Sequence, residues 1–148
     1  MRSARQQTFL RLSGTRFLRP AKSLLPRFTL FHLIMLPKIN RIKKEKDFEA
    51  IFKNSKSFRS NLFIFKIMKN NLGINRFGFV VSKKVSLRAT IRNKVRRRLT
   101  ETIKVKTTDM INGIDLLIIA LPGIEKKEFS ETKEAINNAL VKSGIILK

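Results

Sequence analysis

The sequence predicts an α+β domain with the element order α-β-β-α-β-α, on the basis of three observations. Residues 62–68 and 77–81 are short segments rich in Phe, Ile and Val, which is typical of β-strands. Residues 115–121 form a continuous apolar run, as expected of a strand buried on both faces. Three other segments repeat apolar residues at intervals of three or four positions, which predicts amphipathic helices before, between and after these strands.

The first helix is expected at residues 47–53, where Phe48, Ile51 and Phe52 fall at helical spacing. The first strand is expected at residues 62–68. Successive side chains of a strand point to opposite faces of the sheet, so its even-numbered residues share one face and its odd-numbered residues the other. An Asn-Asn-Leu-Gly sequence follows and predicts a turn.

The second strand and the helix after it carry the most informative pattern of the chain. Gly78, inside the strand at residues 77–81, predicts a bulge or a close approach of another group to the backbone. The apolar residues of the helix recur every four positions and lie on one side: Ile91, Val95, Leu99 and Ile103. Five basic residues within residues 92–99 cover much of the remaining surface. A charge array fixed on a helix suggests a partner with closely spaced negative charges, such as a nucleic-acid backbone.

The last helix follows the buried strand at residues 115–121. Ser130 is a plausible N-cap, and Gly144 is expected to end the helix. Its apolar stripe consists of Ile136, Ala139 and Leu140.

The composition points to a polyanionic partner and excludes several kinds of catalytic site. The chain carries 33 Lys and Arg against 10 Asp and Glu, a formal charge of +23. Nucleic acid is the first expectation for the partner, and an anionic membrane surface is the second. Cys is absent and His32 is the only His, which excludes thiolate sites and, in the folded part, His-based metal sites and Ser-His-Asp triads. No paired carboxylates or phosphate-cradling loop can be identified, so neither catalytic nor metal-binding residues are expected.

Residues 1–34 differ in composition from the rest of the chain. They contain seven Arg and Lys and no acidic residue, a composition typical of a transit peptide. The alternative is that translation starts at Met35 and that the segment is a mis-assigned extension. In either case it is expected to be disordered, with the folded domain at residues 35–148. That domain still carries 26 basic and 10 acidic residues, so the argument from charge does not depend on the extension.

Three groups of residues are candidate contacts to nucleic acid. The first is the polar face of the basic helix: Arg92, Asn93, Lys94, Arg96, Arg97 and Arg98. A merely solvated face is the alternative, but Glu101 is the only acid nearby that could offset the repulsion. Lys83 and Lys84 are either an exposed strand end or further phosphate contacts. For Phe48 and Phe52 the spacing alone favours core packing, and the alternative is an aromatic platform under an unpaired nucleotide.

The ordered motifs resemble a known family. Residues 77–84 read Phe-Gly-Phe-Val-Val-Ser-Lys-Lys, and residues 92–97 read Arg-Asn-Lys-Val-Arg-Arg. Together they resemble the signature of the bacterial ribonuclease P protein component: a glycine-containing strand that ends in Ser-Lys-Lys, followed by an Arg-Asn-Arg helix. The resemblance covers residues 36–144 and implies a ribosomal-protein-S5-like α/β sandwich. It also implies a left-handed β-α-β crossover, which sequence reasoning would not predict because right-handed connections dominate.

The resemblance implies two binding sites. The basic helix residues named above would bind the catalytic RNA. A central cleft between the sheet and the first helix would hold the single-stranded 5′ leader of precursor tRNA, and its residues would be Phe48, Phe52, Ile64, Lys66 and Val80, flanked by Lys83 and Lys84. Lys94 stands where the family often has Arg, and Lys66 and Val80 stand where other members have Tyr and Ser.

The implied role is that of a protein cofactor to an RNA enzyme. The RNA subunit would remove the 5′ leader with Mg²⁺ bound mainly by RNA, and one protein would bind one RNA subunit. The resemblance also implies a bacterial cytoplasmic protein with no membrane partner, organellar targeting by residues 1–34 being the alternative. The rival function is a structural RNA-binding protein, such as a ribosomal or RNA-chaperone component. A membrane-active amphipathic protein is a third possibility, but the buried strand and the distributed turns argue against it.

Overall fold

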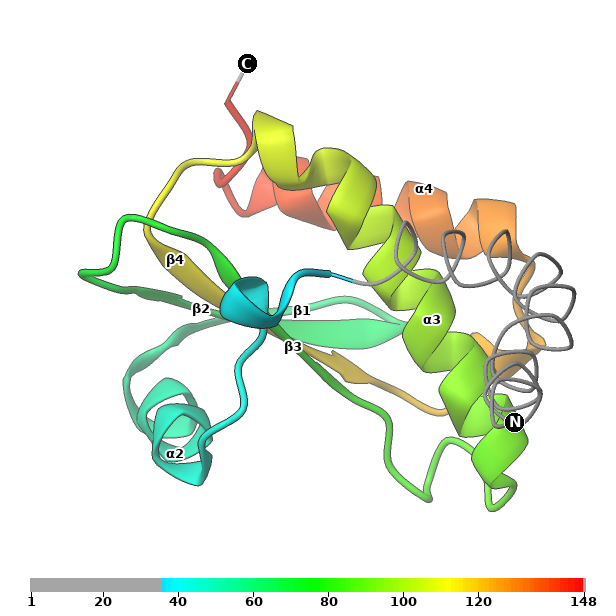
Figure 1. The fold of residues 1–148 in the computed structure, drawn as a ribbon. Coiled ribbons are helices and arrows are strands. Elements are labelled where there is room, and N and C mark those ends of the chain that lie inside the picture. The colour runs from blue at the N-terminus through cyan, green and yellow to red at the C-terminus, as the bar shows by residue number, and fades with distance from the viewer. Residues whose placement is uncertain (1–35, 148) are drawn as a thin grey trace, which may run out of the picture. The chain divides into compact units, whose positions relative to one another are not determined.

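The computed structural model describes residues 36–147 (Figure 1). The expectations for residues 1–34 lie outside the described residues. The main elements of the described part are α2 (Glu45–Asn54), β1 (Lys56–Arg59), β2 (Phe63–Lys69), β3 (Arg76–Val80), α3 (Ala89–Lys106), β4 (Ile114–Ala120) and α4 (Phe129–Lys142). Short 3₁₀ helices are η1 (Lys38–Asn40), η2 (Thr107–Asp109) and η3 (Ile124–Lys126). No helix in this part of the chain is long and apolar enough to cross a membrane.

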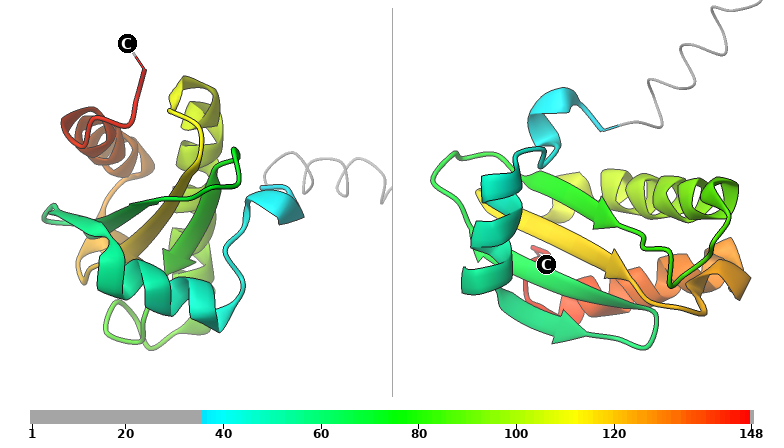
Figure 2. Two further views of the ribbon diagram at one scale, coloured as in Figure 1. Left: turned by 90° about the vertical axis from the view of Figure 1, so that its left-hand side faces the viewer. Right: turned by 90° about the horizontal axis from the view of Figure 1, so that it is seen from below.

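The four strands form one mixed sheet in the order β1-β2-β4-β3. β2 is antiparallel to both of its neighbours, whereas β3 and β4 are parallel and are joined by α3. In the right-hand view of Figure 2 the chain runs along β3, returns behind the sheet through α3 and runs forward again along β4. That path is a left-handed crossover, as the family resemblance implies. α2 covers part of one face of the sheet, and α3 and α4 cover the other.

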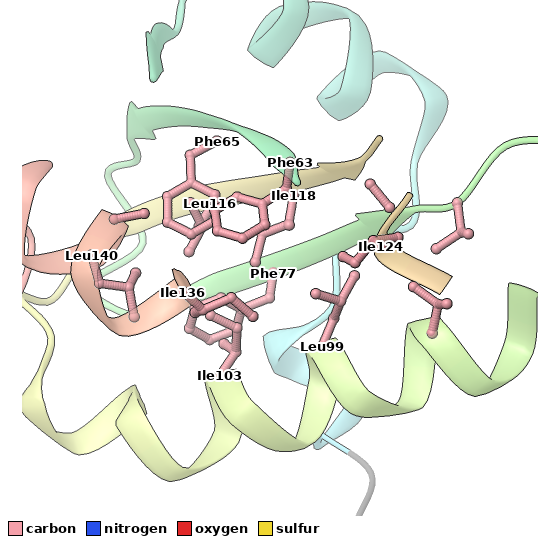
Figure 3. Packing of buried hydrophobic residues seen from close by; sticks show 14 of the residues in the cluster. Phe63, Phe65, Phe77, Leu99, Ile103, Leu116, Ile118, Ile124, Ile136 and Leu140 are labelled. Carbon is pink, nitrogen blue, oxygen red and sulfur yellow. The ribbon is translucent and has the colours of Figure 1, made fainter. Parts of the chain in front are cut away.

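The main core fills the space between the sheet and the pair of helices α3 and α4 (Figure 3). Its fully buried side chains include Phe63, Phe65, Phe77, Leu116 and Ile118 from the strands and Leu99, Ile103, Ile136 and Leu140 from the helices. The stacked rings of Phe63 and Phe65 have centroids 4.9 Å apart. The predicted apolar stripe of α4 and three of the four predicted apolar residues of α3 are therefore confirmed as core, whereas Ile91 is only half-buried. The opposite side of α3 is left to the charged residues.

The structure adds one strand to the predicted order. β1 contains Lys56, Ser57, Phe58 and Arg59, of which Phe58 alone is apolar and half-buried. An edge strand with a single inward apolar side chain shows no alternation that could distinguish it from a loop. β1 therefore carries no sequence signal strong enough to predict it.

The two ends of α4 show one correction and one confirmation. The predicted N-cap Ser130 is wrong, because the helix begins at Phe129 and its N-cap is Glu128. The Glu128 and Glu131 side chains accept hydrogen bonds from each other's backbone N–H groups, so Glu takes the place of the usual Ser or Thr in a capping box. Gly144 follows the helix with φ +72°, a conformation that favours glycine, and it ends the helix as predicted.

Candidate nucleic-acid interface

α2 lies across one end of the sheet and does not extend over the other end of that face (Figure 2, right), which we call the bare end with respect to the described elements. Beneath the helix, Ile51 and Leu117 are fully buried, and Phe48 packs against them. A Cβ atom on Gly78 would lie 2.8 Å from Leu117 Cδ1 and 3.3 Å from Phe48 Cε1. The glycine therefore marks a close approach to the backbone, one of the two predicted alternatives. It allows α2 to sit near the sheet.

A partly buried ion-pair cluster fixes the N-terminal end of α2. The Arg76 guanidinium donates two hydrogen bonds to the carboxylate of Asp115, at 2.9 and 2.6 Å, and one to Asp47 Oδ2 in α2, at 3.0 Å. The Asn70 amide donates a further hydrogen bond of 2.6 Å to Asp115 Oδ1, and the Asp115 side chain is fully buried. The hydrogen bonds that Arg76 donates to the Asp115 carboxylate raise the pKa of Arg76 despite the opposing effect of burial. Because Arg76 is the first residue of β3 and Asp115 the second residue of β4, the cluster attaches α2 to the end of the sheet where these two strands begin.

The bare end of this face presents an apolar row. Ile64 in β2 and Val80 in β3 are both paired with Ile119 in β4, so the three side chains lie side by side across the sheet. All three are half-buried. Lys66 lies one step along β2 on the same face, opposite Leu117. The three sheet residues expected in the cleft, Ile64, Lys66 and Val80, therefore meet on one surface together with α2.

Phe48 and Phe52 have different environments although both belong to α2. Phe48 is half-buried against the sheet, as its spacing favoured. Phe52 is 49% exposed, and the Nζ atom of Lys66 lies 5.4 Å from the centre of its ring. This is a cation–π contact at the edge of the apolar row. Phe52 is thus the ring available to a ligand, whereas Phe48 supports the surface from beneath.

Two residues of this surface carried no signal in the sequence. Ile119 lies within the continuous apolar run of β4, where period-two alternation cannot separate the two faces. Arg59 belongs to the unpredicted strand β1, where it is exposed and pairs with Ile64. It extends the apolar row with a positive charge. We call Phe48, Phe52, Arg59, Ile64, Lys66, Val80 and Ile119 the α2-side surface.

The basic helix α3 exposes part of its predicted set. Asn93, Lys94, Arg96 and Arg97 are exposed, and Arg96 donates a 2.9 Å hydrogen bond to Asn93 Oδ1. We call these four residues the α3 surface. Since Asn93 and Arg97 are one turn apart, the Asn93 amide and two guanidinium groups form one continuous donor array.

Arg92 and Arg98 are held by hydrogen bonds to backbone carbonyl groups. Arg92 Nη1 donates to the carbonyls of Ser86 and Leu87, at 2.9 and 2.8 Å. Arg98 Nη1 donates to the carbonyl of Lys127, at 3.0 Å. Both are only half-exposed. Each can still face a phosphate, but each also ties α3 to a neighbouring segment.

Lys83 and Lys84 lie on the loop that joins β3 to α3. Both are exposed, while Val85 after them is buried and its N–H donates to the Ser82 carbonyl at 3.1 Å. α3 begins at Ala89 with no acidic residue in its first turn, so its positive dipole end adds to the charge of this loop. The loop therefore links Val80, on the α2-side surface, to the start of the α3 surface by a fixed and basic segment.

The two surfaces offer complementary chemistry for a single-stranded polyanion. The α2-side surface provides an exposed ring, an apolar row and two cations, and the α3 surface provides donors for phosphate oxygens. Within residues 36–147 no three Asp, Glu or His side chains lie close enough together to hold a metal ion.

Comparisons with known proteins agree on one family. A family model for ribonuclease P matches residues 36–144. The ribonuclease P protein component of Clostridium botulinum is 37% identical over 109 residues, which cover 73% of this chain and 97% of that protein. The same component of Thermoanaerobacter pseudethanolicus is 33% identical over 111 residues, which cover 75% and 95%.

Solved structures give the same result. The RNase P protein of Staphylococcus aureus superimposes with a TM-score of 0.68 at 27% identity, covering 72% of this chain and 97% of that one. The RNase P protein of Thermotoga maritima superimposes with a TM-score of 0.63 at 28% identity, covering 69% and 96%. The sandwich architecture is thus shared with both structures.

Proposed function

Because the chain belongs to the ribonuclease P protein family, and is therefore a protein subunit of that tRNA-processing endonuclease, we propose that its two surfaces bind different RNAs. The α3 surface binds the catalytic RNA subunit, and the α2-side surface binds the 5′ leader of precursor tRNA. The observation that carries this assignment is the exposed Phe52 ring beside Lys66, above an apolar row that no other described element covers. None of the relatives supports the alternative of a structural RNA-binding protein with no role in cleavage.

The α3 surface acts through charge. Lys94, Arg96 and Arg97 neutralise phosphates of the RNA subunit and release the counterions bound to them, and the neutral Asn93 amide adds hydrogen bonding. Lys83 and Lys84 continue this positive surface toward the sheet, where the leader would run. The protein thereby offsets the repulsion between the catalytic RNA and its substrate, which allows both to associate at lower ionic strength.

The α2-side surface acts by stacking and desolvation. An unpaired base stacks on Phe52 and covers Ile64, Val80 and Ile119, while Lys66 and Arg59 contact its phosphates. Mature tRNA has no 5′ leader and cannot occupy this surface. The proposal therefore predicts preferential binding of the precursor.

Cleavage itself is assigned to the RNA subunit, with Mg²⁺ held mainly by RNA phosphates. The described residues offer no cluster of acidic ligands for such an ion. The protein contributes binding and orientation, in a complex of one protein with one RNA.

The direct test is a cleavage assay at low Mg²⁺, with ribonuclease P RNA, precursor tRNA and the purified protein. The protein should restore cleavage at Mg²⁺ concentrations at which the RNA alone is inactive, and the product should be a mature 5′ end. RNA alone and RNA with a similarly basic unrelated protein are the controls. Equal restoration by the unrelated protein would reduce the effect to general charge screening.

Phe52→Ala is expected to weaken binding of precursor tRNA to the holoenzyme by about 1–3 kcal/mol, because one base loses its stacking partner. The affinity for mature tRNA should not change. Phe52 is 49% exposed, so the free energy of unfolding should change little. Binding is measured by titrating holoenzyme into labelled precursor and mature tRNA, and stability by urea denaturation.

Leu72→Ala is the matched control for Phe52→Ala, since Leu72 is 56% exposed and lies in the turn between β2 and β3. It should leave both affinities unchanged. A large loss of stability in Phe52→Ala with unchanged preference for the precursor would instead assign Phe52 to the core.

A further inference from the structure

A third surface lies away from both of those assigned above. It is a groove of about 660 Å³ at the end of the sheet where β1 begins, β2 ends and the C-terminal end of α4 passes. Its apolar lining includes Phe58, Ile67, Ile111 and Ile145. The volume is within the range of small-ligand sites, and a mostly apolar lining with a few polar groups is typical of such sites.

The register of the sheet explains why the groove has an apolar floor. Phe58 lies opposite the buried Phe65, and Ile67 lies opposite Lys56, so Phe58 and Ile67 point toward the α4 side of the sheet. β1 is an edge strand, so no further strand covers it. α4 ends at Lys142, and the chain then turns away at Gly144.

Backbone hydrogen bonds hold the far wall of the groove. The Ile111 N–H donates to the Ile145 carbonyl at 2.9 Å, and Met110 and Ile146 form an isolated antiparallel bridge. Ile145 is buried. The wall formed by residues 143–146 is therefore fixed to the body of the domain.

Three lysines from three different elements line the groove: Lys56 from β1, Lys69 from β2 and Lys142 from α4. All three are exposed, and none of the lining residues is acidic. Among the described residues, none of the three forms an ion pair with a carboxylate. Their charges are therefore available to an anion.

The C-terminal end of α4 would by itself repel an anion. Part of that effect is removed locally, because the N–H of Ser143 donates to the Ala139 carbonyl and the Ser143 hydroxyl donates to the Leu140 carbonyl. Lys142 adds a positive charge at the same place. The net electrostatic character of the groove is positive.

We propose that this groove binds one unpaired nucleotide of an RNA, with the base against Phe58 and Ile67 and the neighbouring phosphates against Lys56, Lys69 and Lys142. An apolar floor with one aromatic ring and three unpaired cations matches a planar base on a charged backbone. The identity of the RNA rests on the proposed function, which supplies two sources: the ribonuclease P RNA and precursor tRNA. The site is separate from the α2-side surface, because Phe58 and Phe52 lie on opposite sides of the sheet.

A tryptophan reporter tests whether a base enters the groove. The chain has no Trp or Tyr, so Phe58→Trp introduces the sole indole fluorophore. Its emission should be quenched in a saturable manner by single-stranded oligoadenylate of six nucleotides. Leu72→Trp places the same reporter on the exposed turn between β2 and β3 and should show little quenching. Equal quenching of both reporters, or none at saturating oligonucleotide, would overturn the proposal.

Two variants that each lose two lysines test whether the groove lysines contact phosphates. Neither variant changes a core residue. Lys56→Ala/Lys142→Ala should flatten the plot of log affinity for oligoadenylate against log salt by about 1.4, since each phosphate contact to a single strand contributes about 0.7. At about 0.1 M salt this corresponds to roughly 25-fold weaker binding. Lys126→Ala/Lys133→Ala removes two exposed charges outside the groove and should have a much smaller effect. Equal losses in the two variants would show that only general charge is involved.

Competition identifies the source of the nucleotide. Unlabelled ribonuclease P RNA, precursor tRNA and mature tRNA are each used to displace oligoadenylate from the Phe58→Trp protein. Displacement by the first alone assigns the groove to the catalytic RNA, and displacement by precursor but not mature tRNA assigns it to the leader. Failure of all three to displace the probe would refute the assignment to these RNAs. If the unmodified protein restores cleavage while the lysine variants bind all RNAs normally, this inference fails and the proposed function stands.

Discussion

Replacing Arg76 by Leu is expected to lower the free energy of unfolding by about 3–5 kcal/mol, the largest stability effect that a single surface-proximal substitution should produce in this domain. The Asp115 side chain is fully buried and receives two hydrogen bonds from Arg76. Without the guanidinium, its carboxylate would keep only the Asn70 amide as a side-chain partner. A buried charge with so little compensation is costly. The change in the free energy of unfolding is measured by urea denaturation. The dependence of that free energy on urea concentration should match that of the unmodified protein.

Two further variants separate the buried contact from the exposed one. Asp47→Asn removes only the outer partner of Arg76. The Asp47 side chain is 26% exposed, so the free energy of unfolding should fall by about 1 kcal/mol or less. Arg76→Leu/Asp115→Leu removes both buried charges and should recover part of the stability lost in the single variant, since an apolar pair of similar volume needs no compensation. If Asp47→Asn were as damaging as Arg76→Leu, the main role of Arg76 would be to hold α2 and not to neutralise Asp115.

The cluster of Arg76, Asp115 and Asp47 also affects the position of the Phe52 ring, and hence the proposed binding of the leader. Asp47 links α2 to Arg76 at the start of β3, and Phe52 lies on α2 little more than one turn further on. A loosened helix would displace the Phe52 ring from Lys66 before the domain unfolds. Asp47→Asn should therefore affect discrimination between precursor and mature tRNA more than it affects stability.

Elements with strong apolar periodicity were predictable from the sequence, and those defined by tertiary contacts were not. The four-residue repeat of α3 and the apolar run of β4 both identify core segments, because burial requires those patterns whatever the partners are. β1 is stabilised by pairing with β2 and by Phe58 alone, so its identity depends on a neighbour. The Arg76–Asp115 pair joins residues 39 positions apart, a relation that no local spacing encodes.

The same distinction between local pattern and tertiary contact applies to the candidate site. The basic residues of α3 were identifiable by type, but their environments were not. Arg92 and Arg98 bond to backbone carbonyls, which places them between structural and binding roles. Phe48 and Phe52 were equivalent in sequence, but in the structure Phe48 packs against the buried Ile51 and Leu117 whereas Phe52 is 49% exposed. The chemical type of a residue can thus be taken from the sequence, whereas its exposure to a ligand depends on how the domain packs.

Replacing Lys94, Arg96 and Arg97 together by Ala is expected to cause the largest loss of RNA binding. These side chains are exposed, and none of them donates to a backbone carbonyl within the described residues. If the unmodified protein neutralises about six phosphates, log affinity for ribonuclease P RNA should fall against log salt with a slope of about −5. Three lost contacts should flatten that slope by about 2.7 and weaken binding roughly 500-fold at about 0.1 M salt.

The fold should survive this triple substitution, which makes the binding result interpretable. Ala has the highest helix propensity, and removal of three neighbouring like charges relieves repulsion along α3. The matched control, Lys38→Ala/Lys126→Ala/Lys133→Ala, removes the same charge from exposed positions outside α3. A salt slope that flattens equally in both triples would mean that the excess charge acts as a diffuse field. A slope that flattens mainly in the α3 triple would place the contacts on that helix, because the slope reports how many phosphates the removed residues neutralise.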